Sequence, residues 1–351
     1  MDSKTTRCEY YEVCPDQMNS NQKSYLVAQS SDRPGQHADV LTCVLRTLRL
    51  GRALYCASDL SCPWAIHFRR RDNPIFHVVD RGAAWLIGPD EVPLALIGGD
   101  VVLLPHGHAH TLADDPTRKP KVVDFADHPQ VRSGGGPAHW GGGGARTMLV
   151  CGEFHVEGPT TLSLLPELPP CIVLRAGDAS EWLTMTLRLL SHESLGMEPG
   201  APLIMDRLIE VIFIQCVRAF LRTSAVPTQG WLAALREPTL ARALSLLHQR
   251  PAHPWTVEEL GRCVGLSRSV FAQRFTESVG EPPLGYLTRW RVQLSAARLL
   301  ASPGDSLKSI ADSVGYASLP AWNRAFRRYA SQPPARGRDE HLRLRALSAS
   351  T

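Results

Sequence analysis

The C-terminal third of the chain nearly repeats itself, and this repeat constrains the fold more than any other feature. The stretch TVEELGRCVGLSRSVFAQRF, which begins at Thr256, aligns with SLKSIADSVGYASLPAWNRAF, which begins at Ser306. A Val-Gly pair ends the first half of each copy, at Gly265 and at Gly315. Glycine at such a place is typical of a helix end that turns back. Each copy therefore predicts a helix, a turn and a second helix.

Local chemistry supports a helix-turn-helix in both copies. Thr256 and Glu259 form a T-x-x-E capping box that starts the first helix. Ser267 and Ser318 are good N-caps for the second helix of each copy. Between the copies, residues 284–301 predict one long helix that would hold the two units at a fixed separation. Aromatic residues spaced i,i+4 predict the buried face of each second helix: Phe271 with Phe275, and Trp322 with Phe326.

The outer faces of the two second helices carry small, polar and basic side chains. Such side chains can contact base edges and phosphates in a major groove. We therefore predict that this segment binds double-stranded DNA and reads two successive major-groove segments. The candidate DNA-binding residues are Arg268, Ser269, Ala272 and Gln273 in the first copy, and Pro320, Ala321, Asn323, Arg324 and Arg327 in the second.

The charge distribution agrees with this prediction. The whole chain has a formal net charge of +4, which excludes little. Residues 231–351, however, hold 17 Lys and Arg against 9 Asp and Glu, a net charge of +8, and residues 1–230 have a net charge of −4. A basic segment supplies the electrostatic attraction to phosphates that underlies most DNA affinity.

Residues 37–177 predict a β domain. Short apolar runs separated by Gly, Pro, Asp and Asn are typical of antiparallel strands in a sandwich or barrel. A helical pattern precedes them from Asp39, and the glycine-rich insert 133–144 predicts a mobile surface loop. The flanking segments predict a flexible arm over residues 1–36 and a basic tail over residues 336–351. The expected strands cover residues 53–58, 64–69, 76–79, 84–87, 94–97, 101–104, 148–156 and 172–174.

Residues 178–230 predict a helical hairpin. Residues 179–192 and 203–223 read as two helices, separated by a Gly- and Pro-containing break. The second helix is apolar nearly all round, so it must be buried somewhere. Packing against the β domain and a subunit interface in a homodimer are both compatible with this pattern.

These stretches also resemble a known family. The repeat and its linker, WTVEELGRCVGLSRSVFAQRFTESVGEPPLGYLTRWRVQLSAARLL and IADSVGYASLPAWNRAFRR, resemble the DNA-binding domain of the AraC/XylS family of bacterial transcription regulators. Residues 99–110 have the form G-x5-P-x-G-x2-H, which resembles the second motif of the cupin barrel. Residues 37–175 as a whole resemble the cupin-type sensor domain that precedes the DNA-binding domain in some AraC-family regulators.

The resemblance implies an α+β multidomain fold. It comprises an N-terminal cupin-like antiparallel β-barrel, a middle helical hairpin and a C-terminal all-α double helix-turn-helix domain over residues 231–335. It also implies an unknown small-molecule effector that controls promoter binding, contact with RNA polymerase, and activation of transcription.

Four histidines belong to the two cupin-like motifs. His77 lies in the first motif, and His106, His108 and His110 lie in the second. Cupin enzymes hold a divalent metal with such histidines and a carboxylate, which the first motif here lacks. We expect an effector pocket at these residues and no enzyme activity. A divalent metal in the barrel, and with it a metal-dependent cupin enzyme carrying a DNA-binding tail, is the alternative.

The cysteines suggest a third interpretation, in which the protein is a thiol-based redox-sensing regulator. The chain has nine cysteines without C-x-x-C pairs, which fits reduced thiols in a cytoplasm. Cys56, Cys62 and Cys151 are candidate redox sensors if they are exposed with a lowered pKa. Buried cysteines are otherwise inert apolar residues. No signal peptide and no apolar run long enough for a bilayer is found, so we expect a cytoplasmic protein without a membrane partner.

Overall fold

A computed structural model describes residues 39–47, 49–88, 90–123, 137–157, 164–178, 181–195, 198–222, 229–302, 304–330 and 333–334. The predicted flexible arm, residues 1–36, and the predicted basic tail, residues 336–351, lie outside these residues. The chain divides into two compact units. One contains the strands and residues up to 226, and the other contains residues from 227 onward together with the short helix that ends at Thr47.

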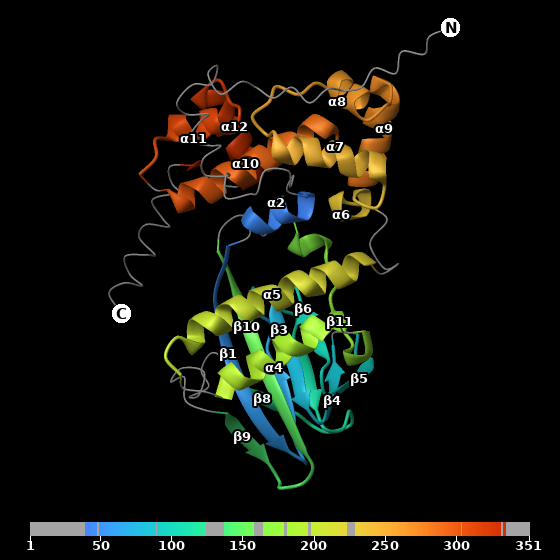
Figure 1. Ribbon diagram of the computed structural model, residues 1–351, viewed down its shortest axis with the longest axis vertical. Helices are drawn as coiled ribbons and strands as arrows, with labels where there is room; N and C mark the ends of the chain where they lie inside the picture. The colour runs from blue at the N-terminus through green and yellow to red at the C-terminus, as the bar shows by residue number, and fades with distance from the viewer. Residues whose placement is uncertain are drawn as a thin grey trace. The chain divides into compact units, whose positions relative to one another are not determined.

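The first unit contains two β-sheets (Figure 1). Strand β9 is parallel to β1 and β8 is parallel to β2, and the other pairs are antiparallel. Among the described residues the cupin-like fold is thus built from two sheets, which do not close into the barrel that the sequence suggested. The six-stranded sheet has the order β11 (Ile172–Leu174), β6 (Val101–Leu104), β3 (Ile75–Arg81), β10 (Arg146–Glu157), β1 (Arg49–Ser61) and β9 (Ala138–Gly141). The five-stranded sheet has the order β5 (Pro93–Ile97), β4 (Ala83–Ile87), β7 (His110–Ala113), β2 (Ala65–Phe68) and β8 (Lys121–Val123).

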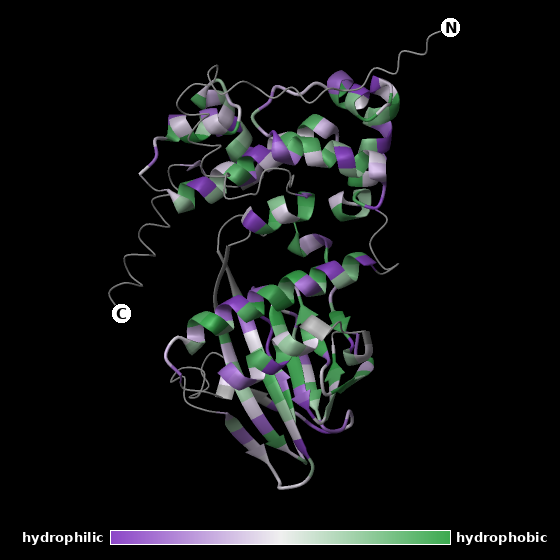
Figure 2. Cartoon of the chain, viewed as in Figure 1, coloured by the Kyte–Doolittle hydropathy of each residue, from purple (hydrophilic) through white to green (hydrophobic). Residues whose placement is uncertain are grey.

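One hydrophobic core lies between the two sheets. Alternate residues of most of these strands face it, as the period of two requires. Figure 2 shows hydrophobic residues concentrated along the central strands of this unit. The core includes Leu60, Ile66, Phe68, Ile75, Val79, Leu86, Leu96, Val102, Leu104, Leu112, Leu149 and Cys151.

Two helices cover the outer face of the six-stranded sheet. They are α4 (Glu181–Leu195) and α5 (Ala201–Arg222). The rings of Phe154 on β10 and Phe213 on α5 meet edge to face, with centroids 5.2 Å apart. Ser191 on α4 donates a hydrogen bond to Asp80 at the end of β3. The apolar character of the second hairpin helix is therefore explained by packing on the β domain. The subunit interface stays a prediction.

Three strands were not expected from the sequence. β7, β8 and β9 are three or four residues long and mix polar with apolar residues, so they give little periodic signal. β9 lies inside the glycine-rich insert that was predicted as a mobile loop, of which residues 133–136 lie outside the described residues. Gly141 ends this strand with a φ of +124°, and a Cβ there would lie 1.7 Å from the Ser61 carbonyl oxygen. The described part of the insert is thus held closely against β1.

The second unit is entirely helical in its described residues. Two helix-turn-helix units, α8–α9 and α11–α12, flank the long helix α10, as the repeat predicted. The linker helix begins one residue before the expected start, at Pro283. The helices are α2 (Val40–Thr47), α6 (Trp231–Ala234), α7 (Pro238–Gln249), α8 (Val257–Cys263), α9 (Arg268–Val279), α10 (Pro283–Ala301), α11 (Leu307–Ser313) and α12 (Leu319–Ala330).

The predicted caps are present in both copies. The Thr256 hydroxyl accepts a hydrogen bond of 3.1 Å from the Glu259 backbone N–H. The Glu259 carboxylate does not close the capping box, however, because it contacts His253 Nε2 at 2.9 Å. Gly265 and Gly315 have φ values of +76° and +87°, the left-handed conformation expected where the first helix ends.

Helix α2 packs within the helical unit, although the sequence grouped it with the β domain. It contacts α7 and α10, and its Val40, Val44 and Thr47 are buried. The Gln293 side chain of α10 donates a hydrogen bond of 3.2 Å to Thr47 Oγ1. Only residue 48 separates α2 from β1.

This packing predicts that α2 stabilises the helical unit. We expect Val44→Ala to lower its free energy of unfolding by about 2 kcal/mol, because Val44 is 1% exposed and its loss leaves a cavity. Calorimetry of the full chain should show a lower melting temperature for the helical unit. Leu284→Ala, at a position that is 40% exposed, is the control. An unchanged transition in Val44→Ala would contradict the assignment.

The ordered part of the insert gives a second prediction. Gly141→Ala should lower stability by more than about 2 kcal/mol, because the backbone is left-handed and the Ser61 carbonyl occupies the Cβ position. Gly143→Ala should cost only about 1 kcal/mol, since its φ is +86° but nothing lies within 4 Å of the added Cβ. Chemical denaturation measures both. Equal effects would show that close packing at Gly141 is absent.

Candidate nucleic-acid interface and sensor cavity

Helix α9 presents the first predicted DNA-contacting face, which we call its reading face, to solvent. Arg268, Ser269 and Gln273 are exposed and Ala272 is half-buried. The rings of Phe271 and Phe275 are buried on the opposite face, with centroids 5.6 Å apart. The face that the sequence assigned to DNA is therefore the one that packing leaves open.

Two acidic contacts on and beside α9 were not foreseen. The Gln273 side-chain amide donates a hydrogen bond of 2.9 Å to Glu277 on the next turn, which orients the amide. Arg274 forms an ion pair of 2.9 Å with Glu237, just before α7. Arg274 therefore helps to hold α9 on the helical unit, and its charge is partly neutralised there.

Helix α12 presents the second reading face in the same way. Pro320, Arg324 and Arg327 are exposed, and Ala321 and Asn323 are half-buried. Trp322 and Phe326 are buried behind them, with ring centroids 5.4 Å apart. Pro320 lies in the first turn of α12, where the missing N–H of proline costs no helical hydrogen bond.

Arg291 of α10 connects the two copies. Its guanidinium donates hydrogen bonds of 2.6 and 2.8 Å to the carbonyls of Pro251 and His253, which precede α8. The same group lies over the ring of Tyr316, in the turn of the second copy, 5.8 Å from the centroid. Burial lowers the pKa of Arg291 from its ordinary value. At that same turn, a Cβ on Gly315 would lie 2.6 Å from the Ala252 carbonyl oxygen, so the copies approach closely.

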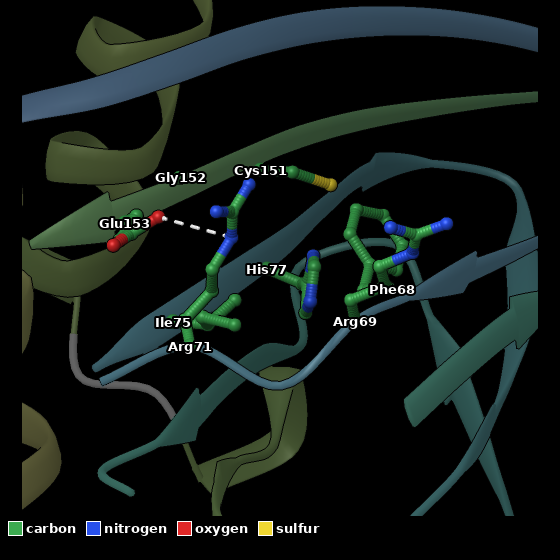
Figure 3. Close-up of a pocket in the computed structure, with 8 residues that line it drawn as sticks. All are labelled: Phe68, Arg69, Arg71, Ile75, His77, Cys151, Gly152 and Glu153. Carbon is green, nitrogen blue, oxygen red and sulfur yellow. Dashed lines mark ion pairs between the residues drawn. The ribbon is translucent and has the colours of Figure 1, made fainter. Parts of the chain in front are cut away.

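The β unit contains a cavity where the end of β2 and the start of β3 meet the middle of β10 (Figure 3). It has a volume of about 310 Å³, including the part that is open to solvent. Arg71 and Glu153 form an ion pair of 3.7 Å in its wall, and Asn73 donates a hydrogen bond of 2.7 Å to Glu153. The residues that line it are Phe68, Arg69, Arg71, Ile75, His77, Cys151, Gly152 and Glu153.

Two of the four predicted histidines meet inside this unit. The Nε2 atoms of His77 on β3 and His110 on β7 lie 2.7 Å apart, and both rings are buried. The ring of Phe68 stacks on His110, with centroids 4.9 Å apart. Burial lowers the pKa of His110 to about 4 and holds the pKa of His77 well below its ordinary value. Both imidazoles are therefore neutral at pH 7.

The other two histidines form a pair of their own. The rings of His106 and His108 have centroids 5.3 Å apart, and His106 Nε2 lies 2.9 Å from the Leu168 carbonyl oxygen. Among the described residues, no group of three or more His, Cys, Asp or Glu is arranged to hold a metal ion. The His77–His110 pair supplies two nitrogens, fewer than the three protein ligands that a catalytic metal usually has, so the described residues alone do not complete the alternative metal site.

The environment of the three candidate redox cysteines raises the pKa of each thiol. Cys56 and Cys151 lie directly opposite each other on β1 and β10, and both are buried free thiols. Burial raises the pKa of both and that of Cys62 above the ordinary value. A raised pKa reduces the fraction of reactive thiolate. The condition on which redox sensing depended, an exposed thiol with a lowered pKa, is thus not met by these three residues.

Several residues of the site were missed by the sequence analysis. Phe68, Arg71 and Glu153 belong to the cavity, and Arg291 joins the two copies. The alternation of apolar residues in β2 could have indicated that Phe68 faces inward. The contacts of Arg71 and Arg291 depend on pairing between distant segments, for which the sequence carries no signal. No helix of the described part is long and apolar enough to cross a membrane.

Comparison with known proteins agrees with both halves of this description. A cupin family model matches residues 39–222, and a helix-turn-helix domain model matches residues 260–340. The chain is 32% identical to the HTH-type transcriptional regulator AlkR of Acinetobacter baylyi, over 86% of this chain and 99% of that one. It is 35% identical to an AraC-like transcription regulator of Streptomyces antibioticus, over 84% and 95% respectively.

Among solved structures, ToxT of Vibrio cholerae is similar over 82% of this chain and 97% of that one, with 12% identity and a TM-score of 0.31. The family matches, the two exposed reading helices and the cavity in the cupin-like unit together lead to one conclusion. The chain belongs to the AraC family of DNA-binding transcription regulators that carry an N-terminal cupin domain.

Proposed function

We propose that α9 and α12 enter two successive major-groove segments of one promoter and that occupancy of the β-unit cavity changes the affinity for that promoter. The observation that carries this proposal is the pair of open reading faces on two helices joined through α10. Two such helices can read one face of a duplex when they are one helical turn of DNA apart. An effector changes the DNA affinity only if it binds more tightly to one of two conformations.

The side chains of the two faces divide into two kinds of contact. Gln273 and Asn323 can form paired hydrogen bonds with adenine, and Arg268 and Arg324 can do so with guanine. Arg327, one turn after Asn323 and beyond the start of α12, is suited to a phosphate. Ala272 and Ala321 are small enough to let the backbone approach, and they can contact a thymine methyl group.

The further partners follow from the family. We assign transcription activation through RNA polymerase, at promoters in the cytoplasm where the chromosome lies. The sequences of the relatives support a regulator, and we assign no catalytic reaction to the cavity.

A homodimer through the α4–α5 hairpin completes the proposal. Met185, Leu189, Leu203 and Ile204 are exposed on these two helices, each between 41% and 63%. Exposed apolar side chains gathered on neighbouring helices are typical of interaction surfaces. Analytical ultracentrifugation should show a dimer that Leu189→Glu with Leu203→Glu converts to a monomer. A wild-type protein that is monomeric at all concentrations would rule out this interface.

Sequence reading by the two helices is directly testable. In footprinting on the DNA upstream of the gene, Gln273→Ala should lose about 1–3 kcal/mol of binding free energy at its own base pair and relax specificity there. Arg327→Ala should weaken binding to all sequences and reduce the dependence of affinity on salt concentration. Arg207→Ala, on α5 in the β unit, is the control with an equal charge change. Uniform loss with Gln273→Ala would mean that this side chain reads no base.

The role of Arg291 gives a prediction about spacing. Arg291→Lys removes the forked donor that contacts two carbonyls, so the two copies should no longer be held in one arrangement. Wild-type protein should lose affinity at least about 10-fold when five base pairs are inserted between the two half-sites, because the second groove then faces away. Arg291→Lys should bind the original site more weakly and discriminate less between the two spacings. Equal discrimination by both proteins would show that Arg291 does not set the spacing.

A further inference from the structure

The hydrogen-bond chain at His77 and His110 fixes the position of each proton. His110 Nδ1 lies 2.8 Å from the His108 carbonyl oxygen, which can only accept, so Nδ1 carries the proton. Because His110 is neutral, its Nε2 carries no proton and accepts the hydrogen bond from His77 Nε2 at 2.7 Å. Neutral His77 then has no proton on Nδ1. The chain therefore ends in a bare acceptor at His77.

That acceptor is unsatisfied and lies at a cavity. His77 Nδ1 is buried and has no hydrogen-bond partner among the described residues, and His77 lines the cavity described above. A buried polar atom without a partner costs about 1–3 kcal/mol. A ligand that donates a hydrogen bond to this nitrogen would recover that free energy.

The neighbours of His77 limit the polarity and charge of such a ligand. On its own strand Ile75 also lines the cavity, and directly opposite on β10 lies Cys151, whose thiol is protonated. The Phe68 ring lies 4.9 Å from the His77 ring, tilted by 58°. Figure 3 shows His77 between these side chains, with the Arg71 and Glu153 ion pair to one side. The carboxylate and one of the two arginines in the wall thus neutralise each other, and Phe68, Ile75 and Cys151 give the cavity apolar surface near the His77 ring.

We propose that the cavity binds a small, uncharged compound with an apolar body and one hydroxyl or N–H group, and that His77 Nδ1 accepts the hydrogen bond from that group. This inference rests on the proposed function, since it names the class of effector for the same cavity. An uncharged donor is favoured over a carboxylate at this nitrogen, because a carboxylate has no proton to donate and would face the nitrogen lone pair. A hydrocarbon without a donor fits the walls but leaves Nδ1 unsatisfied.

Calorimetric titration of the full chain tests the proposal with phenol, toluene and benzoate, three probes of similar size. We expect phenol to bind about 10-fold more tightly than toluene, the gain from one neutral hydrogen bond, and benzoate not to compete with phenol. His77→Phe keeps an aromatic ring and should abolish the preference for phenol. His139→Gln, on β9 with a side chain that is 68% exposed, should leave the preference unchanged.

A second measurement does not depend on the stability of a variant. Nitrogen NMR of histidine-labelled wild-type protein should show His77 with an unprotonated Nδ1 whose resonance shifts on addition of phenol. Equal affinities for phenol and toluene, a proton on Nδ1, or a stoichiometric metal in the purified protein would each overturn the inference. A footprint on promoter DNA, measured with the same sample, distinguishes failure of the proposed effector class from failure of the proposed function. A retained footprint with no preference for phenol removes only the effector class, whereas a lost footprint contradicts the proposed function itself.

Discussion

The half-buried guanidinium of Arg291 is the contact on which the geometry of the DNA-binding unit depends. A helix-turn-helix positions its own reading helix, but nothing within one copy fixes where the other copy lies. α10 provides the connection, and Arg291 joins it to the carbonyls before α8 and to the turn before α12. A guanidinium is suited to this role because its N–H donors point in different directions within one plane, and because the group stays charged when partly buried. Two half-sites at one spacing can be read only if this arrangement persists.

In the β unit the comparable constraint is a single hydrogen bond between neutral imidazoles. It links β3 of one sheet to β7 of the other across the core. Each nitrogen has one role there. The His108 carbonyl accepts a hydrogen bond from His110 Nδ1, so His110 Nε2 must accept the hydrogen bond from His77 Nε2. The same bond leaves one acceptor, His77 Nδ1, at the cavity. In our proposal, the inward histidines of this cupin-like fold bind an effector through a hydrogen bond.

Much of this could be predicted from the sequence, and the part that could not has a common cause. The caps at Thr256 and Ser267, the turn glycines and the outer faces of α9 and α12 are local features, set by residues three or four positions apart. The longer strands were visible as apolar runs for the same reason. The short strand β9, the contact of Arg71 with Glu153 and the contacts of Arg291 join segments that are 25 to 82 residues apart. Pairing of that kind depends on sheet register and on helix packing, which periodicity does not encode.

The helix α2 shows how this limit affects an account of regulation. By sequence it belongs with the β domain, and the cupin family model includes it, yet its buried face packs on α7 and α10. A single residue joins it to β1, the strand in which Cys56 lies opposite the cavity residue Cys151. The boundary between the cupin domain and the DNA-binding domain along the sequence therefore does not coincide with the boundary between the two compact units. A ligand that displaces β10 acts on the strand paired with it, and β1 is nearly continuous with an element of the DNA-binding unit. In the proposed function, α2 is therefore the shortest covalent route by which occupancy of the cavity can change the affinity for DNA, because it ends in packed side chains of the reading unit itself.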